Sequence, residues 1–171
     1  MNRRFFLAAL PAALAAGCGF QLRRPVGIPF ASLYVDASPG SAVSQRILSS
    51  LAADKHTRLA ATAAEAEAVL KINQENRGKT ILSLSGAGRV TEYRLGYRLS
   101  YSINGKGERV LAAPEVIELY RDMTYDDSQL LAKKAEEQLL YRDMVEFAAI
   151  RILRRLQSIN PGNGTEPKKP S

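Results

Sequence analysis

Few residues in this chain of 171 residues are able to carry out chemistry. It has one cysteine, Cys18, and one histidine, His56. A zinc or copper site needs several such ligands, and a nucleophile triad needs a histidine beside the nucleophile, so we expect neither. The chain also has no glycine-rich phosphate loop and no G-x-S-x-G motif. We therefore expect no enzyme, no metal and no cofactor, although a site made only of carboxylates would leave no signal in the sequence.

The setting of Cys18 predicts that this cysteine carries a lipid. Arg3 and Arg4 precede an apolar stretch over residues 5–14, and small residues then lead to the cysteine. This order is that of a secretory signal, and the apolar stretch is about half of the ~20 residues that a membrane-spanning helix needs. Residues 14–18 resemble a lipobox, with Ala15 where leucine is commoner. We predict removal of residues 1–17 and an N-acyl diacylglycerol on Cys18.

The same segment bears on export and location. The two arginines fit a general secretory signal, which we favour, and they also resemble a twin-arginine signal. Gly19 stands after the cysteine where aspartate would retain the protein in the inner membrane, so we expect the outer membrane. Each buried acyl methylene contributes ~0.8 kcal/mol, so three chains would anchor the protein permanently. The mature protein should lie at the periplasmic side without spanning the membrane.

Length and charge limit what the mature chain can be. Removal of the first 17 residues leaves 154, enough for one domain, and lowers the net charge from +7 to +5. A mildly basic protein at a membrane suits anionic lipid, an acidic polymer or no specific partner, and nucleic acid is not expected there. We expect a single domain over residues 18–159 that starts with an extended lead, followed by a disordered tail over residues 160–171.

The first half of the mature chain alternates between strand and helix signals. Residues 33–36 predict a short strand, and residues 41–53 predict an amphipathic helix after a turn at residues 38–41. Residues 60–68 fit either a helical turn or the entry to a strand. Residues 69–76 predict a strand that residues 77–79 interrupt and residues 81–85 resume.

The second half contains the clearest pattern. Residues 93–103 alternate between apolar and polar types, which predicts a half-buried strand with the tyrosines in the core. Residues 104–107 predict a hairpin turn, and Pro114 requires a break or an edge position in a return strand over residues 110–125. A long helix follows from Asp127, with Asp127 or Ser128 as its cap. We expect an α+β fold in which two helices cover one face of a small, mostly antiparallel or mixed sheet of about four strands.

Several motifs in order resemble one protein family. Cys18-Gly19-Phe20-Gln21-Leu22-Arg23 resembles the mature start of the LptE family of lipopolysaccharide-assembly lipoproteins. Val90-Thr91-Glu92-Tyr93 is similar to the Glu-Tyr that opens a strand of that family. Leu131-Ala132-Lys133 with Glu136-Glu137, and later Gln157-Ser158-Ile159, resemble the two ends of its last helix.

The resemblance implies a partner, a ligand and a location. It implies a lipid-anchored outer-membrane protein that plugs the lipopolysaccharide translocon barrel LptD as a heterodimer, helps to assemble it and binds lipopolysaccharide. Basic contacts of the family fall in the turn before Glu-Tyr and on the last helix, which makes Arg89 and Lys133 the lipopolysaccharide-binding candidates. At the turn the match is loose, because glycine can occupy the basic position with Arg89 as its neighbour.

Four further residues are candidates for contact with the barrel. They are Glu92, Tyr93, Arg94 and Arg98, and a polar row of this kind suits the polar lumen of a membrane barrel. Ordinary surface positions for the arginines, and a strand-end hydrogen bond for the other two, remain open alternatives. The alternative function is a stand-alone lipoprotein that faces the periplasm and binds anionic lipid or polysaccharide without a barrel.

Overall fold

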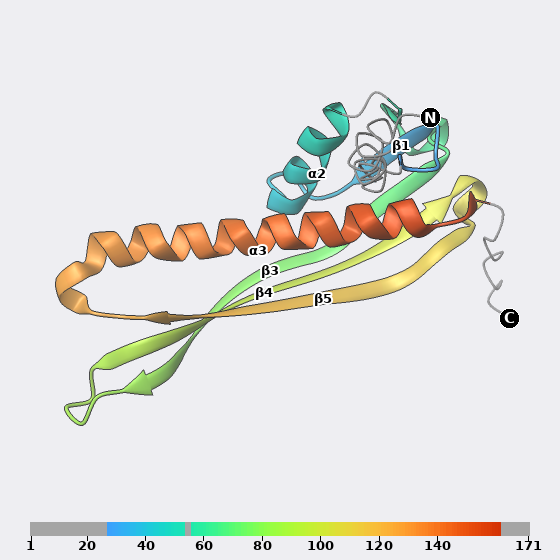
Figure 1. The fold of residues 1–171 in the computed structure, drawn as a ribbon. Helices are drawn as coiled ribbons and strands as arrows, with labels where there is room; N and C mark the ends of the chain where they lie inside the picture. Colours follow the sequence, from blue (N-terminus) through green and yellow to red (C-terminus); the bar gives the residue numbers. More distant parts are fainter. Residues whose placement is uncertain (1–26, 54–55, 162–171) are drawn as a thin grey trace, which may run out of the picture.

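The computed structural model describes residues 27–53 and 56–161, and this part of the chain forms an α+β fold (Figure 1). A mixed sheet with the strand order β2-β1-β3-β4-β5 is covered on one face by helices α2 and α3. This confirms the predicted fold class. The sheet has five strands where we expected about four, because Arg58–Leu59 forms a two-residue strand, β2, that is too short to show any periodicity. Cys18 and residues 1–17 lie outside the described residues.

The first unit is a strand, a helix and a parallel strand. β1 (Ser32–Asp36) pairs in parallel with the start of β3 (Ala68–Leu84), so α2 (Ala42–Ala52) crosses over between them. Ser41 caps the helix by accepting a 3.2 Å hydrogen bond from the Ser44 amide. Val43, Ile47 and Leu51 recur every fourth residue and are buried, which confirms the predicted helix. A 3-10 turn at Ala63–Glu65 then leads into β3.

Three long antiparallel strands make up the rest of the sheet. β3 pairs with β4 (Val90–Gly105), and β4 pairs with β5 (Val110–Thr124), the edge strand that carries Pro114. The predicted interruption of β3 at residues 77–79 is wrong. Arg77, Gly78 and Lys79 pair in register with β4, and this long-range pairing overrides their weak preference for strand.

The last helix, α3 (Leu130–Ser158), follows a 3-10 turn at Asp127–Gln129. The cap of this turn is Asp126, whose carboxylate accepts a 2.9 Å hydrogen bond from the Ser128 amide. The prediction of Asp127 or Ser128 is therefore wrong by one or two positions, because Asp126 is the last extended residue before the chain turns. The buried residues of α3 all lie between Tyr141 and Leu156, so its first ten residues contribute nothing to the core. None of the helices within residues 27–53 and 56–161 is long and apolar enough to cross a membrane.

The core lies between the helices and the apolar side of β4. Leu95, Leu99 and Ile103 are fully buried, and Tyr97 and Tyr101 are each 1% exposed, as the alternation predicted. The Tyr101 hydroxyl donates a 2.9 Å hydrogen bond to Glu115, and burial raises the pKa of Tyr101 to about 12. The Tyr97 hydroxyl donates to Glu75 in the same way, so both buried hydroxyls have a carboxylate acceptor, as groups withdrawn from water require.

Glu75 on β3 joins the first helix to the sheet. Its carboxylate accepts hydrogen bonds from the Ser41 hydroxyl at 2.6 Å, the Tyr97 hydroxyl at 2.8 Å and the Val43 amide at 3.4 Å. Hydrogen bonds to a charged acceptor are stronger than those between neutral groups. One side chain therefore holds the start of α2 against the centre of the sheet.

Replacement of this carboxylate tests its structural role. Glu75→Ala should lower the free energy of unfolding by about 1–3 kcal/mol, because the buried Tyr97 hydroxyl loses its acceptor. Glu75→Gln should lose less, since one acceptor oxygen remains. Urea unfolding followed by circular dichroism measures both changes, with Glu65→Ala, an exposed glutamate of the 3-10 turn, as the control. If Glu75→Ala were as stable as Glu65→Ala, Glu75 would not join helix and sheet.

Candidate functional site

The face of the sheet turned away from the helices is open to solvent (Figure 1). Alternation along paired strands places three rows of side chains on this open face, each taken from β3, β4 and β5 in turn. The rows are Asn76–Arg98–Glu118, Gly78–Gly96–Tyr120 and Thr80–Arg94–Asp122. Two of the predicted barrel-contact residues, Arg94 and Arg98, are therefore neighbours on one surface.

The charges of the open face are paired within it. Arg94 donates two hydrogen bonds of 2.8 Å to the two carboxylate oxygens of Asp122, and Arg98 lies 3.3 Å from Glu118. The Arg94 guanidinium holds the pKa of the Asp122 carboxyl below its ordinary value of 3.8, mainly through these hydrogen bonds. Between the pairs, the Tyr120 ring lies beside Gly96, where an added Cβ would be 3.5 Å from the ring. The open face is thus a mostly polar surface that also exposes the Tyr120 ring and the Val116 side chain.

Glu92 and Tyr93 are neighbours in sequence that point to opposite faces. The Glu92 carboxylate accepts a 3.1 Å hydrogen bond from the Ser83 hydroxyl, at the end of the strand pair. The Tyr93 ring packs edge-on against Tyr125 with 5.0 Å between the centroids, and the Lys79 ammonium lies 4.2 Å from its centre. The structure therefore groups Glu92 with the open face and places Tyr93 on the helix side.

The β3–β4 hairpin turn and the start of α3 lie toward one end of the molecule, which we call the distal end (Figure 1). The hairpin turn carries Arg89 and the first turn of α3 carries Lys133, the two lipopolysaccharide-binding candidates. Arg89 is exposed in the turn between β3 and β4, and no partner of its guanidinium is found among the described residues. The Lys133 ammonium donates to Thr124 at 3.0 Å and to Glu136 at 2.8 Å, and its side chain is only 14% exposed. Arg89 is therefore available to a ligand, whereas Lys133 already holds α3 against β5.

Apolar side chains are also exposed toward the distal end. Ile81, Leu82 and Leu84 are between 40% and 57% exposed on the β3–β4 hairpin, and Leu131 at the start of α3 is 82% exposed. Together with Arg89, they give this end both positive charge and apolar surface. That combination matches an amphiphile with an anionic head group better than it matches a simple anion.

Sequence reasoning missed the cations of β3. Lys79 pairs with Glu137 of α3 at 2.5 Å, and the Arg77 guanidinium lies 5.3 Å from the centre of the Tyr141 ring. Arg77 and Lys79 are two residues apart, and so are Glu75 and Arg77. In a strand, this spacing places their side chains on the same face of the sheet. The alternation was available in the sequence, but the assumed interruption at residues 77–79 hid it.

These features define the class of protein: a small α+β domain with one open polar sheet face and an amphiphilic end. Within the described residues, no group of three or more histidine, cysteine or acidic side chains is placed to hold a metal. Residues 30–156 match the model of a family described as lipopolysaccharide-assembly, LptE. Because this match covers most of the chain, the protein belongs to the LptE family of lipopolysaccharide-assembly lipoproteins.

Relatives and solved structures agree with this assignment. The chain is 25% identical over 165 residues to the LPS-assembly lipoprotein LptE of Pectobacterium atrosepticum, covering 94% of this chain and 89% of that protein. The solution structure of lipoprotein B from Nitrosomonas europaea has a TM-score of 0.70 at 35% identity and covers 82% of this chain and 91% of that one. Rare lipoprotein B from Shewanella oneidensis has a TM-score of 0.64 at 28% identity, covering 74% and 94%.

An NMR titration tests the pairing on the open face. The Asp122 carboxyl should titrate below 3.8 in the wild type and closer to that value in Arg94→Gln, because the guanidinium stabilises the carboxylate. A lowered folded-state pKa means that the pair stabilises the fold above the ordinary pKa and loses that effect as the pH falls through the lowered value. Arg98→Gln is the control and should leave Asp122 unchanged. An Asp122 pKa insensitive to Arg94→Gln would contradict the pairing.

Proposed function

We propose that this chain is an outer-membrane lipoprotein that plugs and helps to assemble the lipopolysaccharide translocon barrel LptD, and that it binds lipopolysaccharide during insertion into the outer leaflet. The observation that carries the proposal is family membership over residues 30–156, combined with a sheet whose open face carries paired charges. The Cys18 lipid would tether the domain at the periplasmic side of the membrane.

The barrel part of the proposal is supported by the chemistry of the open face. The lumen of a membrane barrel is polar, so a plug needs a polar surface that exchanges water for polar groups of the wall. Arg94, Arg98 and their two carboxylate partners are all at least 43% exposed in their side chains, which leaves guanidinium and carboxylate atoms free for further hydrogen bonds. The face could thus bind a polar wall without unpaired charges being buried.

The lipopolysaccharide part is supported by the distal end. Lipopolysaccharide combines phosphates with acyl chains, and guanidinium groups bind phosphate in a forked, two-point geometry. Arg89 supplies a guanidinium with no described partner, and the neighbouring apolar side chains could contact acyl groups. Lys133 would contribute from a fixed position, because Thr124 and Glu136 hold its ammonium in place.

Charge reversal on the open face tests binding to the barrel. Arg94→Glu with Arg98→Glu should lower the amount of LptD that co-purifies with the tagged full chain about tenfold, because two new carboxylates would then face the wall beside Glu118 and Asp122, with no arginine to balance them. Lys106→Glu with Arg154→Glu makes the same change of net charge at exposed positions elsewhere and should have no such effect.

Two results would count against the barrel proposal. Equal recovery of LptD with both double variants would mean that the open face is not the contact surface. A wild-type chain that retains no barrel but still binds lipopolysaccharide would instead favour the stand-alone lipoprotein, the second candidate.

Neutral substitutions at the distal end test lipopolysaccharide binding. Arg89→Gln should weaken binding of the lipidated chain to lipopolysaccharide micelles about tenfold, because one charge-assisted hydrogen bond is lost. Lys133→Gln should weaken binding and also lower the thermal midpoint, since the contacts with Thr124 and Glu136 are lost. Lys106→Gln is the matched control, an exposed cation in the other hairpin turn. If Arg89→Gln behaves like Lys106→Gln, the distal turn does not bind the ligand.

A further inference from the structure

A groove with a volume of about 810 Å³ lies between α2 and α3. It forms because α2 has 11 residues and α3 has 29, so α3 extends beyond α2 toward its own N-terminal end (Figure 1). One wall is α2 around Gln45, the other is α3 from Lys134 to Glu146, and Arg77 of β3 lies between them. None of the residues proposed above to bind lipopolysaccharide or the barrel lines this groove.

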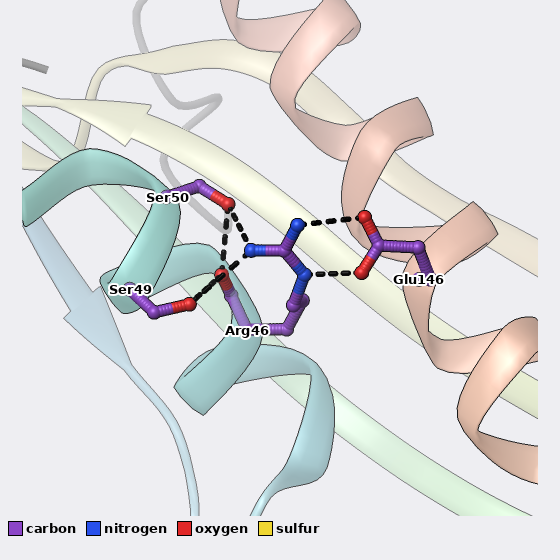
Figure 2. Close-up of polar contacts among 4 residues, drawn as sticks. All are labelled: Arg46, Ser49, Ser50 and Glu146. Carbon is purple, nitrogen blue, oxygen red and sulfur yellow. Dashed lines mark hydrogen bonds and ion pairs between the residues drawn. The ribbon is translucent and has the colours of Figure 1, made fainter. Parts of the chain in front are cut away.

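An ion pair joins the two helices that form the walls of the groove. Arg46 of α2 donates through Nε and Nη2 to both carboxylate oxygens of Glu146 on α3, as Figure 2 shows. Its third nitrogen, Nη1, donates to Ser50 at 2.7 Å and to Ser49 at 3.3 Å. All three nitrogens of Arg46 are therefore engaged, and its role is to fix the distance between the helices.

The side chains that line the groove carry more positive than negative charge. Its two acidic groups are neutralised, Glu146 by Arg46 and Glu137 by Lys79. Three basic side chains remain, namely Arg77, Lys134 and Arg142. Among the described residues none of the three forms an ion pair or hydrogen bond, and only Arg77 has a ring contact, with Tyr141. The groove is thus a concave surface with an excess of positive charge.

The spacing and size of the groove indicate the kind of ligand. Lys134 and Arg142 are eight residues apart on α3, which places them about 12 Å apart along the helix axis. A volume of 810 Å³ is in the range of small-molecule sites, whereas a protein partner would need a broader surface. The amides of Gln45 and Gln138 on the facing walls both donate and accept hydrogen bonds, as sugar hydroxyls do.

We infer that this groove binds the phosphorylated saccharide head group of an anionic glycolipid through Arg77, Lys134 and Arg142. The inference rests on the proposed function for the class of ligand, and it adds a second site for the head group. Lys133 and Lys134 are adjacent but point about 100° apart around the helix, so the first lies against β5 while the second lines the groove.

Calorimetry with a head-group probe tests the inference. The probe is a glucosamine disaccharide that carries a phosphate at each end and no acyl chains, titrated into the lipidated full chain in detergent. The triple variant Arg77→Gln, Lys134→Gln, Arg142→Gln should bind it at least about tenfold more weakly, since one lost charge-assisted hydrogen bond already has that effect.

Two matched triple variants separate the site from net charge and from folding. Arg58→Gln, Lys106→Gln, Arg154→Gln removes the same charge from exposed positions outside the groove and should bind as the wild type does. Arg77→Lys, Lys134→Arg, Arg142→Lys keeps the charges in the groove and should retain most of the affinity. The inference is overturned if the groove variant binds like the wild type, or if the control variant loses as much.

Further outcomes identify the ligand and separate the two proposals. Equal binding of the unphosphorylated disaccharide, or equal competition by inorganic phosphate, would overturn the assignment of the head group. A photocrosslinker at Gln138 that captures a polypeptide in cells instead of a glycolipid would do the same. If the wild type binds LptD and lipopolysaccharide but not the disaccharide, only the groove inference fails. If it binds the disaccharide but neither LptD nor lipopolysaccharide, the proposed function fails and the groove remains.

Discussion

The structure depends on the burial of one side of β4. Leu95, Leu99 and Ile103 lie on that side with no exposed surface, and each buried side chain of this size contributes about 1.5–3 kcal/mol. A strand alternates between its two faces, so covering this side leaves the other side outward. Both helices pack on the apolar side, so the opposite face must be polar enough to face water without a covering layer. The ion pairs of Arg94 and Arg98 supply polar groups there.

The unequal lengths of the two helices create the other surfaces. The part of α3 from Tyr141 to Leu156 is held by the core, and the preceding part is held by polar contacts such as Lys79 with Glu137. This first part of α3 has the basic groove on the side that faces α2, and it has the amphiphilic distal end at its start. A short crossover helix therefore leaves room for ligand surfaces that a longer helix would have filled.

Local patterns predicted most elements and missed those that depend on distant partners. The alternation over residues 93–103 predicted β4, and the four-residue spacing of Val43, Ile47 and Leu51 predicted α2. The strand through residues 77–79 was missed because Arg-Gly-Lys has little strand preference, and only its pairing with β4 makes it a strand. β2 was missed because two residues cannot show a period.

By itself, the sequence determined which residues share a face. Arg94 and Arg98 are four apart in a strand and must point the same way, whatever packs around them. Only the tertiary structure decided whether a charged residue is available for binding. Asp122 lies 28 positions from Arg94 and Glu146 lies 100 positions from Arg46, so these pairs exist only through strand register and helix docking. For the same reason Lys133 is held by Thr124 while its neighbour Lys134 is open to the groove, a distinction that no local pattern encodes.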